Sequence, residues 1–267
     1  MMKMRYRTRA GLAATLAVLL CGILSCTVKE DRTPCPCYLN VSFADRDAIA
    51  HPVTLAGWDG GALFREEIDV GEHDPCWTKA VRKGMLTLTA CMGGMASDLR
   101  GHSVMIPAGS QADSLYAFHT EVDCTGETAY AHVTLLKQFA TVSVDLHKTP
   151  ARMQELSFIV RGTSCGFDLL DHRPVEGAFL YAVPQAKAGT LDFRIPRQKD
   201  DGLTLEVSRD GERLGLFPLG RFIRLTGYDW KADELKDIRI SIDLVLGEAL
   251  ISVDGWEEGV VIHFVEQ

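Results

Sequence analysis

In the sequence Ile238-Arg239-Ile240-Ser241-Ile242-Asp243-Leu244-Val245-Leu246, every second residue is isoleucine or leucine, and mostly polar residues lie between them. A period of two places alternate side chains on opposite faces of a strand. The pattern therefore predicts a β-strand with one face in a core and the other in water. The same alternation recurs at residues 86–90, 132–135, 140–147 and 203–208.

Because strand patterns dominate the chain, we expect an all-β protein built from antiparallel β-sandwiches. After residue 25, no stretch has the length and periodicity of a long amphipathic helix. The strand pattern breaks at His147-Lys148-Thr149-Pro150-Ala151 and restarts at Leu156. We therefore predict an N-terminal β-sandwich domain at residues 38–149 and a C-terminal one at residues 150–267, each of a usual sandwich size.

The first 26 residues have the order of a lipoprotein signal peptide. Basic residues without any acid precede an apolar run, Ala10 to Leu24, which is shorter than the roughly 20 residues needed to span a bilayer. Ile23-Leu24-Ser25-Cys26 then matches the lipobox, in which the cysteine is acylated and becomes the new N-terminus. We predict that residues 1–25 are removed, that Cys26 carries the lipid and that residues 26–37 form the lipidated tether.

An uncleaved N-terminal anchor with an incidental cysteine is the alternative interpretation. Cys21 is a poorer lipidation candidate than Cys26, because Leu20 before it is not small. The charged segment Thr27–Arg32 resembles the export signal that sends some lipoproteins to the outer face of the outer membrane. We therefore predict a lipid-anchored, surface-exposed protein of the cell outer membrane.

The charge of the chain bears on its partners. The 267 residues have a net charge of −8, and removal of the four basic residues within residues 1–25 takes this charge to −12. A nucleic-acid-binding protein would carry a basic surface. The acidic balance therefore argues against nucleic acid as a partner.

Six of the eight cysteines remain as thiols after loss of Cys21 and acylation of Cys26. They are Cys35, Cys37, Cys76, Cys91, Cys124 and Cys165. An oxidising compartment permits disulfides, but the C-x-C pair can hardly bridge itself because disulfide geometry is specific. Each member of that pair could reach Cys76, Cys91 or Cys124, so the pairing stays open. Zinc is the less favoured alternative, because neither C-x₂-C pairs nor nearby histidines are present.

The sequence contains one apparent catalytic motif. Gly162-Thr163-Ser164-Cys165-Gly166 matches the G-x-S-x-G pattern of serine hydrolases, which works at a strand–turn–helix bend. Too few residues follow before Pro174 to form the required helix. The eight histidines have no metal-binding spacing, and paired acids next to each other in turns do not face one another across a sugar. We predict no catalytic residue, no metal site and no cofactor.

Two further features concern binding. Trp58, Trp230 and Trp256 are predicted close to strand edges and turns, where an aromatic ring commonly closes a sandwich or, alternatively, stacks on carbohydrate. The segment at residues 260–265 is apolar on both faces apart from His263. Such a strand is either buried on both sides or pairs with something else.

Three blocks of the sequence resemble the FimB-type fimbrial anchor lipoproteins of Bacteroidota, the fimbrillin-associated anchor proteins. The first block joins Cys26 to Glu30-Asp31-Arg32-Thr33-Pro34-Cys35-Pro36 and the strand Tyr38–Phe43. The second block is Lys83–Ala90 with the glycine pair that follows it, and the third runs through Leu219–Ile223, Thr226–Trp230 and Asp237–Asp243 to Trp256. The blocks keep the family order along nearly the whole chain.

The resemblance implies two transthyretin-like β-sandwich domains in tandem. It also implies an outer-membrane anchor, assembly or length-limiting subunit of a fimbria, with a fimbrillin-like stalk subunit bound by strand addition. An anchor that keeps its lipid cannot lose its N-terminal strand and stay attached, which fits a subunit that starts or ends a polymer. This chain departs from the family's short tether in having Cys35-Pro36-Cys37, so no disulfide pairing is carried over.

We therefore expect a non-enzymatic surface lipoprotein that anchors a fimbria at its base and assists its assembly or length control. Either the C-terminal strand or another sheet edge is expected to contact the next subunit. The contact candidates are Val260, Val261, Ile262, Phe264 and Val265. The alternative is a glycan- or host-binding adhesin on the same scaffold, with Trp58 or Trp230 at the ligand.

Overall fold

The structure is a computed structural model of the 267-residue chain. It describes residue 32 and residues 35–49, 51–72, 76–93, 98–147, 156–184, 189–243, 248–253 and 260–263. For residues 48, 72, 98–100, 243, 248–253 and 260–263 the description covers the backbone only. The predicted signal peptide, the lipidation site Cys26, Trp256 and the contact candidates Phe264 and Val265 lie outside the described residues.

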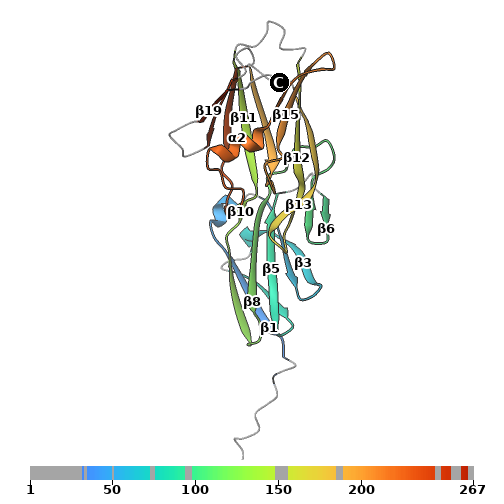
Figure 1. Ribbon diagram of the computed structural model, residues 1–267. Helices are drawn as coiled ribbons and strands as arrows, with labels where there is room; N and C mark the ends of the chain where they lie inside the picture. Colours follow the sequence, from blue (N-terminus) through green and yellow to red (C-terminus); the bar gives the residue numbers. More distant parts are fainter. Residues whose placement is uncertain are drawn as a thin grey trace, which may run out of the picture. The chain divides into compact units, whose positions relative to one another are not determined.

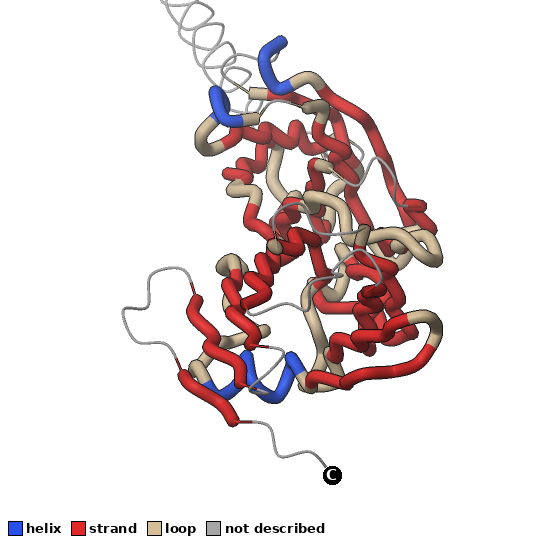
Figure 2. The backbone as a smooth tube through the Cα atoms, turned by 90° about the horizontal axis from the view of Figure 1, so that it is seen from above, coloured by secondary structure: helices blue, strands red, loops and turns tan. Residues whose placement is uncertain are grey.

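Residues Cys37–Gln267 form one compact unit, whose described residues build four β-sheets. Figure 2 shows that strand predominates and that helix is confined to short segments. The helical segments are the α-helix α2 (Leu219–Leu225) and the 3₁₀ helices η1 (Arg46–Ala48) and η2 (Val70–Glu72). Within the described residues, no helix has both the length and the apolar character needed to cross a membrane.

Two sheets enclose a core in the first part of the unit. Their strands are β1 (Cys37–Phe43), β2 (Val53–Trp58), β3 (Ala62–Ile68), β4 (Trp77–Val81), β5 (Met85–Met92), β8 (Tyr116–Asp123), β9 (Thr128–Val133) and β10 (Leu136–Lys137). One sheet has the order β4-β1-β9 and the other the order β10-β8-β5-β2-β3. Alternate apolar side chains such as Leu39 and Val41 of β1 and Leu86 and Leu88 of β5 pack in one buried cluster. The period-two pattern therefore places the core, as predicted.

The other two sheets enclose a second core. Their strands are β6 (Asp98–Arg100), β7 (Ser103–Met105), β11 (Phe139–His147), β12 (Leu156–Asp168), β13 (Arg173–Val183), β14 (Thr190–Pro196), β15 (Thr204–Arg209), β16 (Glu212–Phe217), β17 (Ile238–Asp243), β18 (Glu248–Val253) and β19 (Val260–His263). One sheet has the order β14-β11-β17-β18-β19, and the other has the order β16-β15-β12-β7-β6 with β13 also paired to β12. Figure 1 shows helix α2 beside β11 and β15. Leu219 and Ile223 of this helix are buried in the second core.

The alternation at residues 238–243 is confirmed as strand β17. Ile238, Ile240 and Ile242 are at most 2% exposed, whereas Arg239 between them is exposed. Strand β17 lies between β11 and β18, and so its apolar face belongs to the centre of a sheet. A mostly β structure is thus confirmed, and the described residues contain one short α-helix, α2, that no strand pattern predicts.

The expectation of purely antiparallel sheets is wrong for two strand pairs. Strand β1 runs parallel to β9, and β11 runs parallel to β17. A parallel pair needs a long connection, and in both cases several strands intervene along the chain. Alternation of side chains reports which face is buried but carries no information on the direction of the neighbouring strand, which explains the error.

The division into two domains at residues 149/150 stays a prediction. Two segments from before that point pair with strands from after it. Strands β6 and β7 join the sheet of β12, and β11 joins the sheet of β14 and β17. Strands from before the predicted boundary thus complete the two sheets whose other strands come from after it, because long-range pairing need not follow a break in the local pattern.

Candidate functional site

The first described strand of the chain lies in the middle of a sheet. Cys35 is exposed, and Cys37, two residues later, begins β1 and is fully buried. Strand β1 is central in its sheet, with β4 antiparallel on one side and β9 parallel on the other. A pull on the predicted tether would therefore act directly on a strand that is paired along both edges.

The opposite end of the chain supplies a sheet edge. Strand β19 pairs with β18 and is the last strand of its sheet, so among the described strands it has one neighbour. An edge strand presents unpaired N–H and C=O groups that another chain can use. The contact candidates Val260, Val261 and Ile262 lie in this strand. The prediction that this segment contacts a further subunit is not tested by the pairing and stays a prediction.

A polar cavity of about 610 Å³ lies beside the second core. It is lined by Ser103, Asp168, His172, Arg173, Pro174, Val175, Glu176, Arg197, Gln198, Lys199, Trp230, Lys231, Ala232 and Asp233. The lining comes from β7, from the β12–β13 hairpin, from the segment after β14 and from the segment between α2 and β17. Its volume falls within the roughly 300–1,000 Å³ typical of ligand sites. Cationic, anionic and amide groups together offer both hydrogen-bond donors and acceptors.

Arg197 holds two walls of this cavity together. Its side chain is 6% exposed, and it donates to Gln138 Oε1 at 2.9 Å, to the Trp230 carbonyl and to the Asp233 carbonyl. Burial lowers the pKa of Arg197, and the nearby Tyr228 and Asp233 oppose that effect. The guanidinium thus fixes the loop that carries Trp230 against the end of β14.

Trp230 combines a buried ring with an unused donor. The residue is 9% exposed, packs edge-to-face on Tyr228 at 4.7 Å between ring centroids, and lines the cavity. Its buried indole Nε1 has no hydrogen-bond partner among the described residues. The Tyr228 hydroxyl, by contrast, donates to the Lys236 carbonyl at 2.8 Å. A buried N–H without a partner is unfavourable to the fold.

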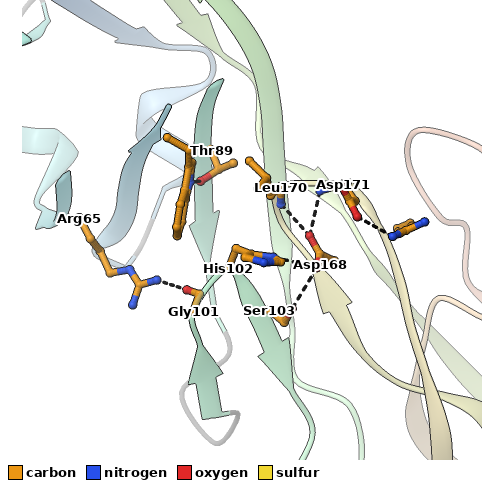
Figure 3. A network of polar contacts seen from close by, with 10 residues as sticks. Arg65, Thr89, Gly101, His102, Ser103, Asp168, Leu170 and Asp171 are labelled. Atoms are coloured by element: carbon orange, nitrogen blue, oxygen red, sulfur yellow. Dashed lines mark hydrogen bonds and ion pairs between the residues drawn. The ribbon is translucent and has the colours of Figure 1, made fainter. Parts of the chain in front are cut away.

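Asp168 organises the hairpin at the cavity wall (Figure 3). Its Oδ1 accepts the backbone N–H groups of Leu170 and Asp171 at 3.0 and 2.8 Å, and its Oδ2 accepts Ser103 Oγ at 3.0 Å and lies 2.8 Å from His102 Nδ1. Burial acts to raise the pKa of Asp168, but these hydrogen bonds outweigh it and lower the pKa below its ordinary value. Asp168 is therefore a structural carboxylate that ties β7 to β12.

Ser164 and Trp58, both singled out from the sequence, are buried. Ser164 lies inside strand β12, is fully buried, and accepts the Lys199 backbone N–H at 3.0 Å. It therefore lacks the exposed bend that a nucleophilic serine requires, in agreement with the sequence prediction. Trp58 is 8% exposed, and its Nε1 donates to Thr89 Oγ1 at 3.0 Å. Its polar edge is thus already satisfied, which distinguishes it from Trp230.

The cysteines fall into different environments. Cys37 and Cys124 are buried in the first core, whereas Cys91 is buried in a separate small cluster. The Cys76 and Cys165 thiols lie against oxygen atoms of Thr78 and of Glu176 respectively. All six are free thiols in the structure. Within the described residues, no group of three or more metal-binding side chains occurs.

Comparison of the fold with solved structures finds surface proteins of Bacteroidales. A protein from Bacteroides thetaiotaomicron, provisionally described as polysaccharide-binding, matches with a TM-score of 0.61 and 14% identity over 86% of this chain and 99% of its own. A provisionally described adhesin from Bacteroides ovatus matches with a TM-score of 0.59 and 10% identity over 87% and 96%. The fimbrial anchor protein Mfa2 from Porphyromonas gingivalis matches with a TM-score of 0.57 and 12% identity over 86% and 99%.

In sequence, no family model matches the chain, and no curated protein matches it. The resemblance to fimbrial anchors is thus confirmed at the level of the fold, at low sequence identity. The three structural neighbours are described as a fimbrial anchor, an adhesin and a polysaccharide-binding protein, and none of the three as an enzyme. Transthyretin-like tandem domains, the lipid anchor and the specific role stay predictions.

Proposed function

We propose that this protein is a surface lipoprotein that anchors a fimbria to the outer membrane and assists its assembly or length control. The observation that carries the proposal is the fold shared with the fimbrial anchor Mfa2 over 86% of the chain. The lipobox at Cys26 and the central position of β1 directly after the tether support it. Two or three acyl chains hold a protein on a membrane far more firmly than one chain does.

The proposed contact with the stalk subunit is made at the outer edge of β19, where no other described strand pairs. An incoming strand would gain main-chain hydrogen bonds along that edge, and pockets for alternate side chains would supply specificity. Strand addition requires backbone N–H and C=O groups rather than particular side chains. A pair of proline variants therefore provides a direct test, because proline removes one backbone N–H.

We expect Val261→Pro and Ile262→Pro to have different effects. Successive N–H groups of an antiparallel edge strand point alternately toward its partner and away from it. One variant therefore removes an N–H bonded to β18 and lowers the melting temperature, whereas the other removes an outward N–H and keeps the fold. In cells that express only the folded variant, stalk protein should appear mainly in the medium, measured by immunoblotting of cell and medium fractions. Normal fimbriae on cells that express only the folded variant would contradict the β19 contact.

A glycan-binding adhesin is the second candidate function. The specific observation in its favour is the cavity of about 610 Å³, which is lined by the Trp230 ring together with several charged side chains. Sugar hydroxyls are both donors and acceptors, and the cavity lining includes Glu176 and Lys199, which form an ion pair at 2.6 Å. The description of the structural neighbour from Bacteroides thetaiotaomicron as polysaccharide-binding is consistent with this candidate.

Trp230→Phe tests the second candidate without removing the aromatic ring. The change removes the buried indole N–H and part of the aromatic surface that lines the cavity. We therefore expect the melting temperature to stay within a few degrees and the affinity for a glycan ligand to fall about five- to tenfold, as for the loss of part of a stacking contact. Ligands would come from a glycan array and affinities from calorimetry. Trp58→Phe is the matched control, since its N–H bonds Thr89 and it does not line this cavity. If no array glycan bound, or if both variants bound like the wild type, the adhesin function would be wrong.

A further inference from the structure

Two buried thiols from distant parts of the chain meet in the first core. Cys37 begins β1 and Cys124 follows the last residue of β8. Both side chains are 0% exposed and belong to the same buried cluster. The Cys37 thiol is among the groups that raise the pKa of Cys124, so the two side chains are neighbours in this cluster.

The backbone holds the two cysteines at the same end of the sheets. Cys37 is paired with Val81 of β4. The Cys124 N–H donates to the carbonyl of Gly84, three residues further along from Val81, at 2.9 Å. The residue after Cys37 in turn donates to the carbonyl of Glu127, three residues after Cys124, at 2.8 Å. These two backbone hydrogen bonds, one on each side of the cysteine pair, fix the relative position of the two Cα atoms. A disulfide requires such a fixed geometry.

We propose that Cys37 and Cys124 form a disulfide in the exported protein, and that this bond clamps the first strand, and with it the tether, to the β8–β9 connection. The proposal goes beyond the anchoring function but rests on the export that the signal peptide predicts. Among the five cysteines that the sequence leaves open, the structure brings this pair together. The other cysteines lie elsewhere, with Cys91 buried in a separate cluster and Cys76 next to Asn40 and Thr78.

The chemistry is thiol–disulfide exchange. The Cys37 thiolate attacks the disulfide of an exported thiol oxidase and forms a mixed disulfide, which releases one oxidase thiolate. The Cys124 thiolate then attacks the Cys37 sulfur and displaces the second oxidase thiolate. The two cysteines lose two protons and two electrons, and the oxidase disulfide is reduced to a dithiol. Since burial, together with the neighbouring Cys37 thiol, raises the pKa of Cys124 to about 11, the bond would form before the core closes and would be inaccessible to reductant afterwards.

The bond changes how the anchor carries force. Without it, a pull on the tether is resisted by the hydrogen bonds of β1 to β4 and β9 and by the side-chain packing of β1. With it, the pull passes covalently from Cys37 to Cys124, so that β1 cannot be drawn out of the sheet. A crosslink across this long segment of chain also stabilises the fold by restricting the unfolded chain.

The first test is a map of the thiols in wild-type protein isolated from membranes. The protein would be denatured without reductant in N-ethylmaleimide, digested and analysed by mass spectrometry. We expect a linked peptide pair that contains Cys37 and Cys124 and that disappears on reduction. Recovery of both residues as N-ethylmaleimide adducts would overturn the proposal.

The second test measures stability with and without the bond. The wild-type protein would be unfolded, fully reduced and then refolded in reductant. We expect its melting temperature to lie on the order of 10 °C below that of the oxidised protein. Cys37→Ala and Cys124→Ala should each melt at a temperature that does not respond to reductant. Cys91→Ala, which replaces another buried cysteine, should respond as the wild type does. A wild-type melting temperature that is insensitive to reduction would overturn the proposal. If Cys37 and Cys124 were free thiols, membrane attachment through Cys26 would be unaffected. Failure of the disulfide proposal can therefore be distinguished from failure of the proposed anchoring function.

Discussion

Replacement of Cys26 by alanine is expected to move this protein from the membrane fraction to the soluble fraction. Each buried acyl CH₂ group contributes about 0.8 kcal/mol to membrane binding, so the loss of all chains removes the predicted attachment entirely. In cells that carry only the variant, fimbriae should detach together with the protein. The measurements are ultracentrifugation of cell membranes, incorporation of labelled palmitate and immunoblotting of stalk protein in the medium.

A matched control for Cys26→Ala is available within the signal peptide. Cys21 lies in the apolar run, with Leu20 before it, and would be removed with residues 1–25. Cys21→Ala should therefore label with palmitate and fractionate like the wild type. Palmitate incorporation that persists in Cys26→Ala would show that the lipobox assignment is wrong. Release of the protein with fimbriae still attached to cells would instead contradict the anchoring role.

Removal of the Arg197 side chain is expected to be among the most destabilising single changes in the described part of the chain. Arg197→Ala should lower the free energy of unfolding by about 3 kcal/mol, because Gln138 Oε1 and the carbonyls of Trp230 and Asp233 all lose a charged donor in a buried place. Arg197→Lys should recover only part of this, since an ammonium group lacks the planar fork that reaches three separate oxygens.

Urea unfolding monitored by tryptophan fluorescence measures the effect of Arg197. Arg221→Ala on α2 is the control, because Arg221 is exposed and its loss should change the stability by no more than about 0.5 kcal/mol. Glycan binding, if present, should fall in Arg197→Ala as well, since the 230–233 wall of the cavity loses its support. An Arg197→Ala protein as stable as Arg221→Ala would show that water replaces the guanidinium at little cost.

The local sequence predicts where strands occur but not which strands pair with one another. The alternation of Ile238, Ile240 and Ile242 predicted both the strand and its buried face, because a period of two is a property of each strand alone. Strand direction and sheet membership were not predictable in this way. Strand β11 pairs with β14 and β17, and β7 pairs with β12, across the break that suggested a domain boundary.

The candidate cavity was only partly visible in the sequence. Trp230 was noted as an aromatic residue close to a turn, but no local signal distinguished it from Trp58. The difference arises from tertiary contacts, since Thr89 satisfies Trp58 and no described residue satisfies the Trp230 N–H. Arg197 gave no signal at all, because its partners lie 33 to 59 residues away in the sequence.

The order of neighbouring residues is enough to predict the strand pattern, the signal peptide and the lipidation candidate Cys26, since each is a local pattern. The sequence also supplied the cysteines but left their pairing open. Only the tertiary structure brought Cys37 and Cys124 together, placed β1 in the centre of a sheet and left β19 at an edge. These features depend on which distant segments share a core, and burial of apolar faces selects those partners from the whole chain rather than from its local order.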